Sequence, residues 1–405
     1  MNHSNRHKTA HLHPRLCGVA LAGMLLAACA YAQAPAAPQE VHWSYPYPAS
    51  LQILDGYRVL YLQGNPEDLG RQHGSLMRET VQRVVEDVIV NGPAATAEGR
   101  LRLYQGTMRM EQYLPQSYRR ELRALAEAAG VDYEPLVALQ LFGDVDRAGL
   151  HLLGGGCSSY AAYGPATRTG ELIAGRNLDY WDNGASKYGA VLICYYPEEG
   201  IPFVTVSWAG IINGWTAMNA CGIIVSNNNA YGGSESLDGI STCFMLRKIA
   251  QFAASVEAGV RIIEEGPRAC GTAMLVAAGE PPTAAVVEFD HEQVAVRWAE
   301  DGYVMATNGF RKLHQPQQQQ YVWECSRYRS IRELIQANYG AIDRTMNFAA
   351  AAGVPISYMN LHSALLFPSD LTMAVSMGAT PACEQRYRPF RFTEQGLVPL
   401  SEAGD

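Results

Sequence analysis

Hydrophobic positions divide the chain into an early helical part and a later part rich in strands. Between residues 68 and 90, apolar side chains recur every three or four positions, which is the spacing of one face of an α-helix. The same spacing predicts a helix over residues 101–130, with a terminal glycine as its stop, and another over residues 134–145. Residues 57–62 favour a short strand. We therefore expect residues 33–156 to form a mainly helical segment.

After residue 156 the pattern changes to short apolar runs separated by Gly and Pro turns, which is typical of strands. Two helices are predicted within residues 242–266 and one over residues 324–338, while a glutamine run at residues 314–320 predicts a surface loop. Strands, then helices, then strands predict an α+β layered architecture rather than a doubly wound parallel sheet. The predicted strands are residues 157–163, 172–177, 190–196, 203–208, 223–229, 273–278, 283–289, 294–298, 303–307, 361–367 and 371–376.

Composition and charge narrow the class of protein. Of 405 residues, 48% are apolar and 17% are charged, which excludes a disordered chain. The formal net charge is −8 and no Lys/Arg run occurs in the body of the chain, so we expect no nucleic-acid partner. No apolar stretch reaches the ~18 residues that a spanning helix requires, so we expect no membrane span.

The first 32 residues have the pattern of a secretory signal. A basic stretch, residues 6–15, precedes an apolar run, residues 16–28, that is too short to cross a bilayer. Two processing sites remain open. A small-x-small site ends at Ala32, whereas a lipobox-like run ends at Cys29 and would place a lipid there. Both predict export to the periplasm or the extracellular space, with a lipid anchor in the second case.

Cysteine usage gives a further hint of chemistry. Two of the nine cysteines lie in or beside the signal, and the other seven are widely spaced without a Cys-x-x-Cys pair, so no zinc site is predicted. An oxidising compartment would permit disulfides, but seven is odd, so at least one thiol should stay free. The seven are Cys157, Cys194, Cys221, Cys243, Cys270, Cys325 and Cys383.

The residues with the clearest chemical potential surround Cys157. Three glycines precede it and leave the backbone open to attack at the Gly156 carbonyl. The two predicted strands that flank a turn at residues 164–170 should form a hairpin. That hairpin would bring Cys157 beside Arg176 and Asp179.

Cleavage of the bond between Gly156 and Cys157 would give the cysteine its own base. An α-amine has a pKa of about 7.7–8.0, close to working pH. Arg176 would favour the thiolate electrostatically, and Asp179 would accept from the α-ammonium and hold it. No histidine is needed. The alternative from the hairpin alone is a buried strand cysteine beside a surface Arg176–Asp179 ion pair.

Five segments in a fixed order carry a resemblance to a known family, and a sixth lies upstream. They resemble the N-terminal-nucleophile (Ntn) hydrolases of peptidase family C45, the acyl-CoA:6-aminopenicillanic acid acyltransferase type. They are more distantly similar to choloylglycine hydrolases and penicillin V acylases. The order and spacing carry the resemblance, because each motif alone is short. The segments are residues 64–74, 156–159, 175–179, 218–223, 306–308 and 326–329.

The resemblance implies a fold and a reaction. The fold is a four-layer αββα Ntn sandwich over residues 157–405, with helices outside two antiparallel sheets. Residues 33–156 would be a pro-segment that stays bound after cleavage as a small subunit. Cys157 would be the nucleophile in self-cleavage and in turnover, and its freed amine the general base. Neither a metal nor an organic cofactor is called for.

The resemblance also implies the oxyanion-hole side chain. Counting ten residues on from Asn219 gives Asn229. Asn227 lies on the same strand face by the two-residue period and is the alternate. A preorganised donor of this kind is worth roughly 10²–10³ in rate. From the sequence alone, a turn is the alternative for these asparagines.

Three further residues take implied roles downstream. Asn308 would hold the substrate amide or the amine, Arg327 would stabilise developing charge, and Ser326 would assist maturation. Without the resemblance, Asn308 could be part of an Asn-Gly turn and Arg327 a solvated helix residue. The resemblance also implies Arg176 and Asp179 as the residues that orient the nucleophile and its amine.

Together these observations predict an exported amidohydrolase that breaks a linear amide bond in a small N-acyl substrate. Hydrolysis is favoured over acyl transfer because acyl-CoA is not expected outside the cytoplasm. Three alternatives stay open: a catalytically dead binding lipoprotein, an acyltransferase to an amine acceptor, and a papain-like enzyme. The last would need His291, His314 or His362 as its base.

Overall fold

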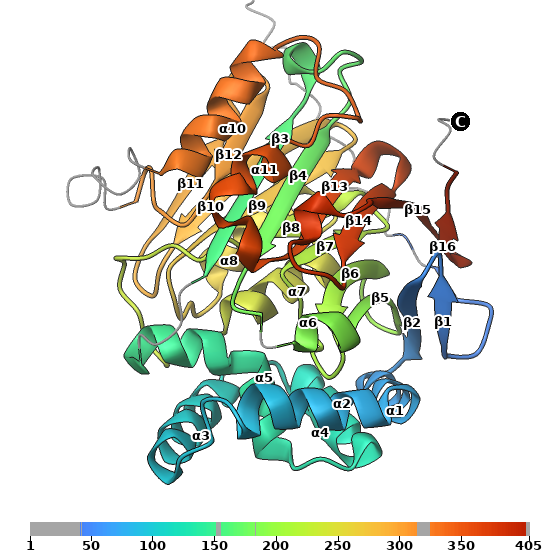
Figure 1. Cartoon of the computed structure of the whole chain (residues 1–405), viewed down its shortest axis with the longest axis vertical. Coiled ribbons are helices and arrows are strands. Elements are labelled where there is room, and N and C mark those ends of the chain that lie inside the picture. Colours follow the sequence, from blue (N-terminus) through green and yellow to red (C-terminus); the bar gives the residue numbers. More distant parts are fainter. Residues whose placement is uncertain (1–40, 42, 151–154, 183, 314–324, 402–405) are drawn as a thin grey trace, which may run out of the picture. The chain divides into compact units, whose positions relative to one another are not determined.

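Two β-sheets with helices beside them make up the fold (Figure 1). The computed structural model describes residues 41, 43–150, 155–182, 184–313 and 325–401. A mixed α+β architecture with two sheets, as expected from the sequence, is confirmed. The predicted signal with Cys29, the loop at residues 314–320 and His314 lie outside the described residues.

Sheet A has nine strands in the order β1-β2-β5-β6-β7-β8-β9-β10-β11. All neighbours are antiparallel except β2 and β5, which pair in parallel. Its strands are β1 (Ser50–Leu54), β2 (Tyr57–Gly64), β5 (Ala190–Pro197), β6 (Phe203–Trp208), β7 (Thr216–Asn219), β8 (Ile223–Ser226), β9 (Thr272–Gly279), β10 (Pro282–Phe289) and β11 (Val294–Trp298). The segment before Cys157 therefore contributes two strands to the sheet as well as helices.

Sheet B is antiparallel throughout and has seven strands in the order β12-β3-β4-β13-β14-β15-β16. Its central strands β3, β4 and β13 are buried along their whole length, which suits strands covered on both faces. The strands are β3 (Gly156–Ala162), β4 (Ile173–Asp179), β12 (Tyr303–Ala306), β13 (Asn360–Phe367), β14 (Thr372–Met377), β15 (Arg388–Thr393) and β16 (Gly396–Pro399).

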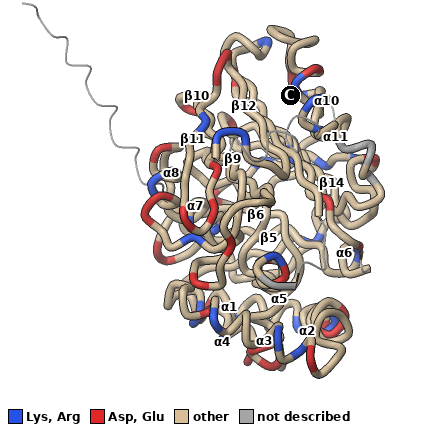
Figure 2. Tube along the Cα trace, turned by 90° about the vertical axis from the view of Figure 1, so that its left-hand side faces the viewer, with Lys and Arg blue, Asp and Glu red and all other residues tan. Residues whose placement is uncertain are grey.

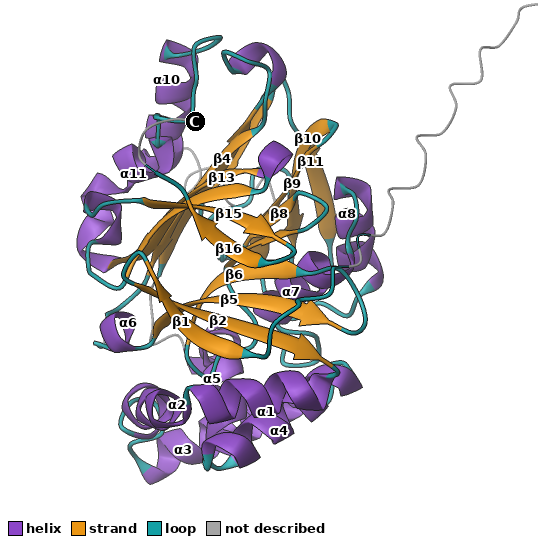
Figure 3. Cartoon of the chain, turned by 90° about the vertical axis from the view of Figure 1, so that its right-hand side faces the viewer, coloured by secondary structure: helices purple, strands orange, loops and turns teal. Residues whose placement is uncertain are grey.

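Helices cover the outer side of each sheet (Figure 3). The inner sides meet where β3 and β12 contact β9. On sheet A, α7 (Thr242–Phe252) contacts β7 and β8, and α8 (Val256–Glu265) contacts β9 and β10. On sheet B, α10 (Ser326–Ala337) and α11 (Phe348–Gly353) contact β3. The short helical turns are η3 (Gly164–Ala166), α6 (Ala185–Tyr188), η4 (Val354–Met359), η5 (Pro368–Asp370) and η6 (Ala382–Glu384).

The early helices lie near one edge of sheet A, where α1 contacts the edge strand β1 and its neighbour β2 (Figure 1). They are α1 (Pro66–Leu76), α2 (Arg78–Val85), the π-helical turn η1 (Glu86–Val90), α3 (Ala97–Glu111), α4 (Gln116–Ala129), α5 (Tyr133–Val145) and the π-helical turn η2 (Asp146–Leu150). The helix predicted over residues 68–90 is divided at Met77, and the one over residues 101–130 is divided before α4. The second division has a clear cause, since Pro115 lacks a backbone N–H and suits the entry to a helix rather than its interior.

Two glycines let α1 and α4 approach closely. A Cβ at Gly70 would lie 2.0 Å from the Glu121 carbonyl oxygen, and one at Gly74 would lie 2.6 Å from that of Leu125. Any larger residue would push the helices apart. Within the described residues, no helix is both long and apolar enough to traverse a bilayer. Acidic and basic residues are interspersed over the described part of the chain (Figure 2).

Candidate active site

Strands β3 and β4 form the predicted hairpin around Cys157. Gly156 pairs with Asp179, and Ser159 pairs with Arg176. Since side chains alternate along a strand, Arg176 shares the Cys157 face of the sheet. Cys157 is buried, with 6% of its surface exposed. The hairpin prediction is confirmed, because residues 19 positions apart in the sequence meet across two neighbouring strands.

Arg176 is fully buried and contacts the thiol directly. Its Nη2 donates to Cys157 Sγ at 3.4 Å and to the Asn227 carbonyl oxygen at 2.6 Å, and its Nη1 donates to the Asn177 carbonyl. A surface ion pair, the alternative open at the sequence level, is therefore wrong. Arg176 thus places its positive charge directly against the sulfur of Cys157.

Asp179 is also fully buried and pairs with Gly156 across the hairpin. Its Oδ1 accepts from Asn360 Nδ2 at 2.8 Å, whereas its Oδ2 makes no hydrogen bond within the described residues and lies 3.9 Å from Arg327 Nη1. Burial raises the pKa of Asp179, although the bond from Asn360 and the charges of Arg327 and Arg176 oppose that rise. An unsatisfied buried oxygen is costly.

Asn308 links the nucleophile to its surroundings. The backbone nitrogen of Cys157 donates to Asn308 Oδ1 at 2.7 Å, and Asn308 Nδ2 donates to the Asn229 carbonyl oxygen at 2.7 Å. Arg327 Nη2 donates to the same Oδ1 at 2.9 Å, and Arg327 Nη1 donates to the Cys157 carbonyl. Arg327 is thus turned inward rather than solvated, with 13% of its side chain exposed. Ser326, the first residue of α10, is exposed.

The two candidate oxyanion asparagines lie just after β8, which ends at Ser226 and is shorter than predicted. Asn227 is buried and engaged at both ends: Oδ1 accepts from Thr272 Oγ1 at 2.7 Å, and Nδ2 donates to Asn229 Oδ1 at 3.0 Å. Asn229 lines the cavity beside Cys157 and has its Nδ2 unbonded among the contacts of the described residues. The geometry therefore favours Asn229 over Asn227 as a donor.

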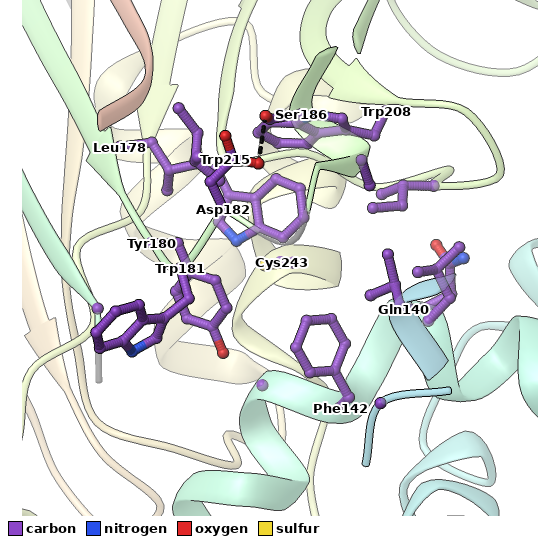
Figure 4. Close-up of a pocket in the computed structure, with 18 of the residues that line it drawn as sticks. Gln140, Phe142, Leu178, Tyr180, Trp181, Asp182, Ser186, Trp208, Trp215 and Cys243 are labelled. Carbon is purple, nitrogen blue, oxygen red and sulfur yellow. Dashed lines mark hydrogen bonds between the residues drawn. The ribbon is translucent and has the colours of Figure 1, made fainter. Parts of the chain in front are cut away.

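Cys157 is one of the residues that line a cavity of about 380 Å³. Figure 4 shows other residues of its walls. Its walls are mainly apolar and aromatic, and they come from both sides of the bond before Cys157. Phe142 belongs to α5, whereas Tyr180, Trp208 and Trp215 follow Cys157 in the chain. Phe142 and Tyr180 pack edge to face at 6.2 Å between ring centroids, as do Trp208 and Trp215 at 5.2 Å. Such walls fit a ligand with a large apolar part.

Histidine does not accompany the nucleophile in the described residues. His362 is buried, lies with Nε2 2.9 Å from Thr216 Oγ1, and has its pKa lowered well below the usual value by burial and then by Arg176. The ring of His291 contacts the Arg268 carbonyl instead. A papain-like pair is thus not formed by either residue.

The remaining cysteines form no disulfide within the described residues. Cys243 lines the same cavity as Cys157, and burial raises the pKa of its thiol. Among the described residues, no group of three or more His, Cys, Asp or Glu side chains is arranged to hold a metal ion.

Sequence reasoning missed two polar residues that hold the site. Asn360, the first residue of β13, bonds Asp179, and only the pairing of β13 with β4 places it there. Tyr231 Oη donates to the Gly155 carbonyl oxygen at 3.3 Å, next to the bond before Cys157. The aromatic cavity walls were missed as well, because they are scattered over four separate segments.

Comparison with known proteins supports the family resemblance. Residues 166–351 match the model of the acyl-coenzyme A:6-aminopenicillanic acid acyl-transferase family. The resemblance inferred from the motifs is confirmed for this segment, which contains Arg176, Asp179, Asn229, Asn308 and Arg327 and begins after the cysteine.

Curated relatives are about a quarter identical to this chain over the aligned residues. Protein dcd1A of Dictyostelium discoideum is 27% identical over 282 residues, covering 66% of this chain and 62% of that protein. Protein dcd1B of the same organism is 26% identical, covering 59% and 51%. An uncharacterized protein of Archaeoglobus fulgidus is 25% identical over 342 residues, covering 71% and 56%. The chain thus spans about half to three fifths of the length of these relatives.

Solved structures with lower identity also match. A Caenorhabditis elegans ortholog of N-acylethanolamine-hydrolyzing acid amidase is 17% identical, with a TM-score of 0.40, covering 53% of this chain and 93% of that one. A mutant of conjugated bile acid hydrolase from Clostridium perfringens is 12% identical with a TM-score of 0.42, covering 60% and 96%. Penicillin V acylase from Agrobacterium tumefaciens is 11% identical with a TM-score of 0.39, covering 60% and 98%.

Proposed function

We propose that this chain is an exported Ntn cysteine amidohydrolase that cuts itself before Cys157 and then hydrolyses a linear amide in a small N-acyl substrate. The environment of Cys157 carries the proposal. Its thiol receives a hydrogen bond from Arg176, and its backbone nitrogen donates to Asn308. Both lie at the apolar cavity. A buried structural cysteine would need neither the arginine nor the open space.

Self-cleavage would begin with attack of Cys157 Sγ on the Gly156 carbonyl carbon. The bond from that carbon to the Cys157 nitrogen breaks, the thiol proton passes to the nitrogen, and a thioester forms. Water then splits the thioester, which leaves a carboxylate on Gly156 and a free amine and thiol on Cys157. Tyr231, bonded to the Gly155 carbonyl, supports the orientation of the peptide under attack.

Turnover would reuse the same atoms. The α-amine of Cys157 takes the thiol proton, the thiolate attacks the substrate carbonyl, and the developing oxyanion accepts a hydrogen bond from Asn229 Nδ2. The resulting ammonium, held by Asp179 and Asn308, gives its proton to the leaving amine. Water attacks the thioester to release the acyl group as a carboxylate, and Arg327 keeps Asn308 in place.

The wider proposal is a four-layer αββα catalytic domain, residues 157–405, with residues 33–156 retained as a small subunit. Retention is supported by β2, which lies between β1 and β5 in sheet A, and by α5, which supplies part of the cavity wall. Export follows from the pattern of the first 32 residues. Peptide mapping of the mature N-terminus would separate a chain starting at Gln33 from one lipidated at Cys29.

Mass spectrometry of the denatured, purified protein tests the function. We expect fragments of about 13 and 27 kDa from the wild type, scaled from the mass per residue after removal of the signal. Cys157→Ala should stay whole. Cys221→Ala, which removes a half-buried thiol that does not line the cavity, should cleave as the wild type does.

A wild type that stays whole with an inert thiol would overturn the proposal and favour the binding lipoprotein. For a cleaved protein, the products formed in the presence of an added amine show whether water or the amine accepts the acyl group. Free carboxylate as the main product supports hydrolysis, whereas a new amide as the main product would establish acyl transfer.

A further inference from the structure

The charged residues that line the cavity beside Cys157 are all acidic. Four aspartates stand among its mainly apolar walls, and no Lys, Arg or His of the described residues lines it. They come from η1, from α5, from the end of β4 and from the loop after β4, so both sides of the proposed cleavage site contribute. The four are Asp87, Asp144, Asp179 and Asp182.

Asp182 is held as an anion by neutral donors. Its Oδ1 accepts from Ser186 Oγ at 2.6 Å and from Gly184 N at 2.8 Å, and its Oδ2 accepts from Thr380 Oγ1 at 2.7 Å (Figure 4). Burial acts to raise the pKa of Asp182, but these bonds and the charge of Lys187 outweigh it and lower the pKa. The carboxylate is therefore charged at neutral pH.

The cations that accompany the other carboxylates do not line the cavity. Arg83 Nε lies 3.5 Å from Asp87 Oδ2, which also accepts from Tyr188 Oη at 2.6 Å. Arg327 accompanies Asp179 at 3.9 Å. The aspartates thus line the cavity and these two cations do not, and a nearer charge acts more strongly on a ligand because the Coulomb energy falls with distance.

Asp144 completes the acidic set from α5. It accepts from Thr242 N at 2.9 Å and from Thr242 Oγ1 at 3.2 Å. Its charge also acts on Arg147, where it helps to raise the pKa of the guanidinium against the lowering effect of burial. Arg147 does not line the cavity either. The four aspartates therefore border the ligand space, whereas Arg83, Arg147 and Arg327 do not line it.

Aromatic faces complete this environment. Trp181, which is 57% exposed, and Tyr180 immediately precede Asp182, and Trp208 and Trp215 also line the cavity. Indole and phenol faces attract cations within about 6 Å and do not attract anions. Carboxylates beside aromatic faces form a setting in which a bound anion would lose its water without gaining a partner.

We propose that this cavity selects amides by the charge of the amine that leaves, with cationic amines preferred, neutral amines next and anionic amines last. The proposal rests on the amidase function proposed above and names the substrate class for that site. It also explains how product would depart, since the acyl group leaves as a carboxylate that the lining repels.

Three decanoyl amides that differ only in the amine would test the order: those of ethylenediamine, ethanolamine and glycine. At low ionic strength we expect kcat/KM to fall by about tenfold at each step from cationic to neutral to anionic. Added salt should narrow the differences. Asp87→Asn combined with Asp182→Asn should narrow the ratio between the ethylenediamine and glycine amides by about tenfold or more.

Asp238→Asn provides the matched control, since Asp238 pairs with Arg109 at the surface and does not line the cavity. It should leave the ratio unchanged. Equal rates for the glycine and ethylenediamine amides in the wild type would overturn the proposal, as would a ratio that the double variant leaves unaltered.

Calorimetry on the Cys157→Ala protein separates this inference from the proposed function. The three amides should bind in the same order without turnover. If the three amides bind in this order of affinity but the wild type hydrolyses none of them, the amidase function is wrong and the charge preference stands. Turnover with equal binding of all three would keep the function and sink the preference.

Discussion

Asp179 brings a carboxylate into a fully buried position, with one oxygen bonded to Asn360 and the other without a hydrogen bond in the described residues. Burial raises its pKa in the folded chain above the unfolded value of 3.8. The unfolded chain therefore loses this proton first as pH rises. Asp179 weakens the fold progressively from about pH 4 up to its raised pKa, and the whole cost is present above it.

Replacement of Asp179 by Asn should relieve that cost. In a Cys157→Ala background, which keeps the chain whole, we expect Asp179→Asn to raise the melting temperature by a few degrees at pH 7 and by less at pH 4. In the Cys157 background the same change should slow self-cleavage strongly. Thermal melts at the two pH values and a time course of cleavage check both parts.

Asp343→Asn is the control with the opposite sign. Bonds from Thr345 lower the pKa of Asp343, so its stabilisation is present above pH 3.8 and lost as pH falls through the lowered pKa. Its replacement should lower the melting temperature slightly at pH 7 and leave it unchanged at low pH. An identical gain for Asp179→Asn at both pH values would contradict the electrostatic explanation.

The chemistry around Cys157 was only partly predictable from its residues. Strand periodicity and one turn sufficed to place Arg176 and Asp179 beside the cysteine. Asn308 and Arg327 follow it by more than 150 positions, and only the family resemblance joined them to the site. Asn360 and the aromatic walls depend on strand order and side-chain packing, which local pattern does not encode.

At the level of elements, η2 fastens the segment before Cys157 to the loop that carries Asn229. Arg147 Nη2, buried, donates to the Ala230 carbonyl at 2.8 Å, the Gly271 carbonyl at 2.7 Å and Glu235 Oε1 at 2.6 Å. Ala230 directly follows Asn229, which bridges to Thr272 across from it. One guanidinium thus ties together the two backbone segments that position the oxyanion donor.

Loss of that guanidinium should disturb both stability and maturation. We expect Arg147→Ala to destabilise the chain by about 3 kcal/mol, because two carbonyls and a largely buried carboxylate lose their partner. Self-cleavage should slow as the Asn229 loop relaxes. Urea unfolding in the Cys157→Ala background measures the first effect, and cleavage half-time in the Cys157 background measures the second.

Arg123→Ala is the surface control for Arg147→Ala. Arg123 is 63% exposed and lies 3.8 Å from Glu111, so its loss should cost less than about 1 kcal/mol and leave cleavage alone. If both substitutions changed the free energy of unfolding and the cleavage half-time equally, the buried contacts of Arg147 would not explain its effect.

Element boundaries were the weaker part of the sequence prediction. Helix α5 and most strands agree with their predicted ranges within two or three residues, because their apolar runs end at Gly, Pro or polar residues. The division at Met77 carries no such signal in the sequence, and the four-residue strand β7 was missed. Residues 50–64 form strands because β5 offers them an edge, which is a tertiary cause.

At the scale of the whole described chain, the parts before and after Cys157 are joined by buried polar contacts as well as by sheet pairing. Glu121 of α4 and Arg247 of α7 form a double hydrogen bond at 2.9 and 2.7 Å, each 1% exposed. Tyr118 Oη donates to Gln251 Oε1 at 3.2 Å, while β2 pairs with β5 over six residues. Cutting one peptide bond leaves all of these in place.

The cleaved fragments should therefore stay together. We expect the pieces of about 13 and 27 kDa to elute as one species in native size-exclusion chromatography and to separate only in denaturant. Elution of the larger fragment alone, with activity, would contradict a structural role for the smaller one. The intact Cys157→Ala chain sets the reference elution volume.

The position of β2 has a consequence for how such a protein can be made. A protein expressed from Cys157 onward would have the free α-amine without self-cleavage. However, β5 would have no neighbouring strand on one side, and the cavity would lack the wall to which Phe142 belongs. A bare apolar strand edge invites other chains to add to it. The segment before Cys157 would then be needed for the folding of the part that follows, because it supplies the strand that pairs with β5.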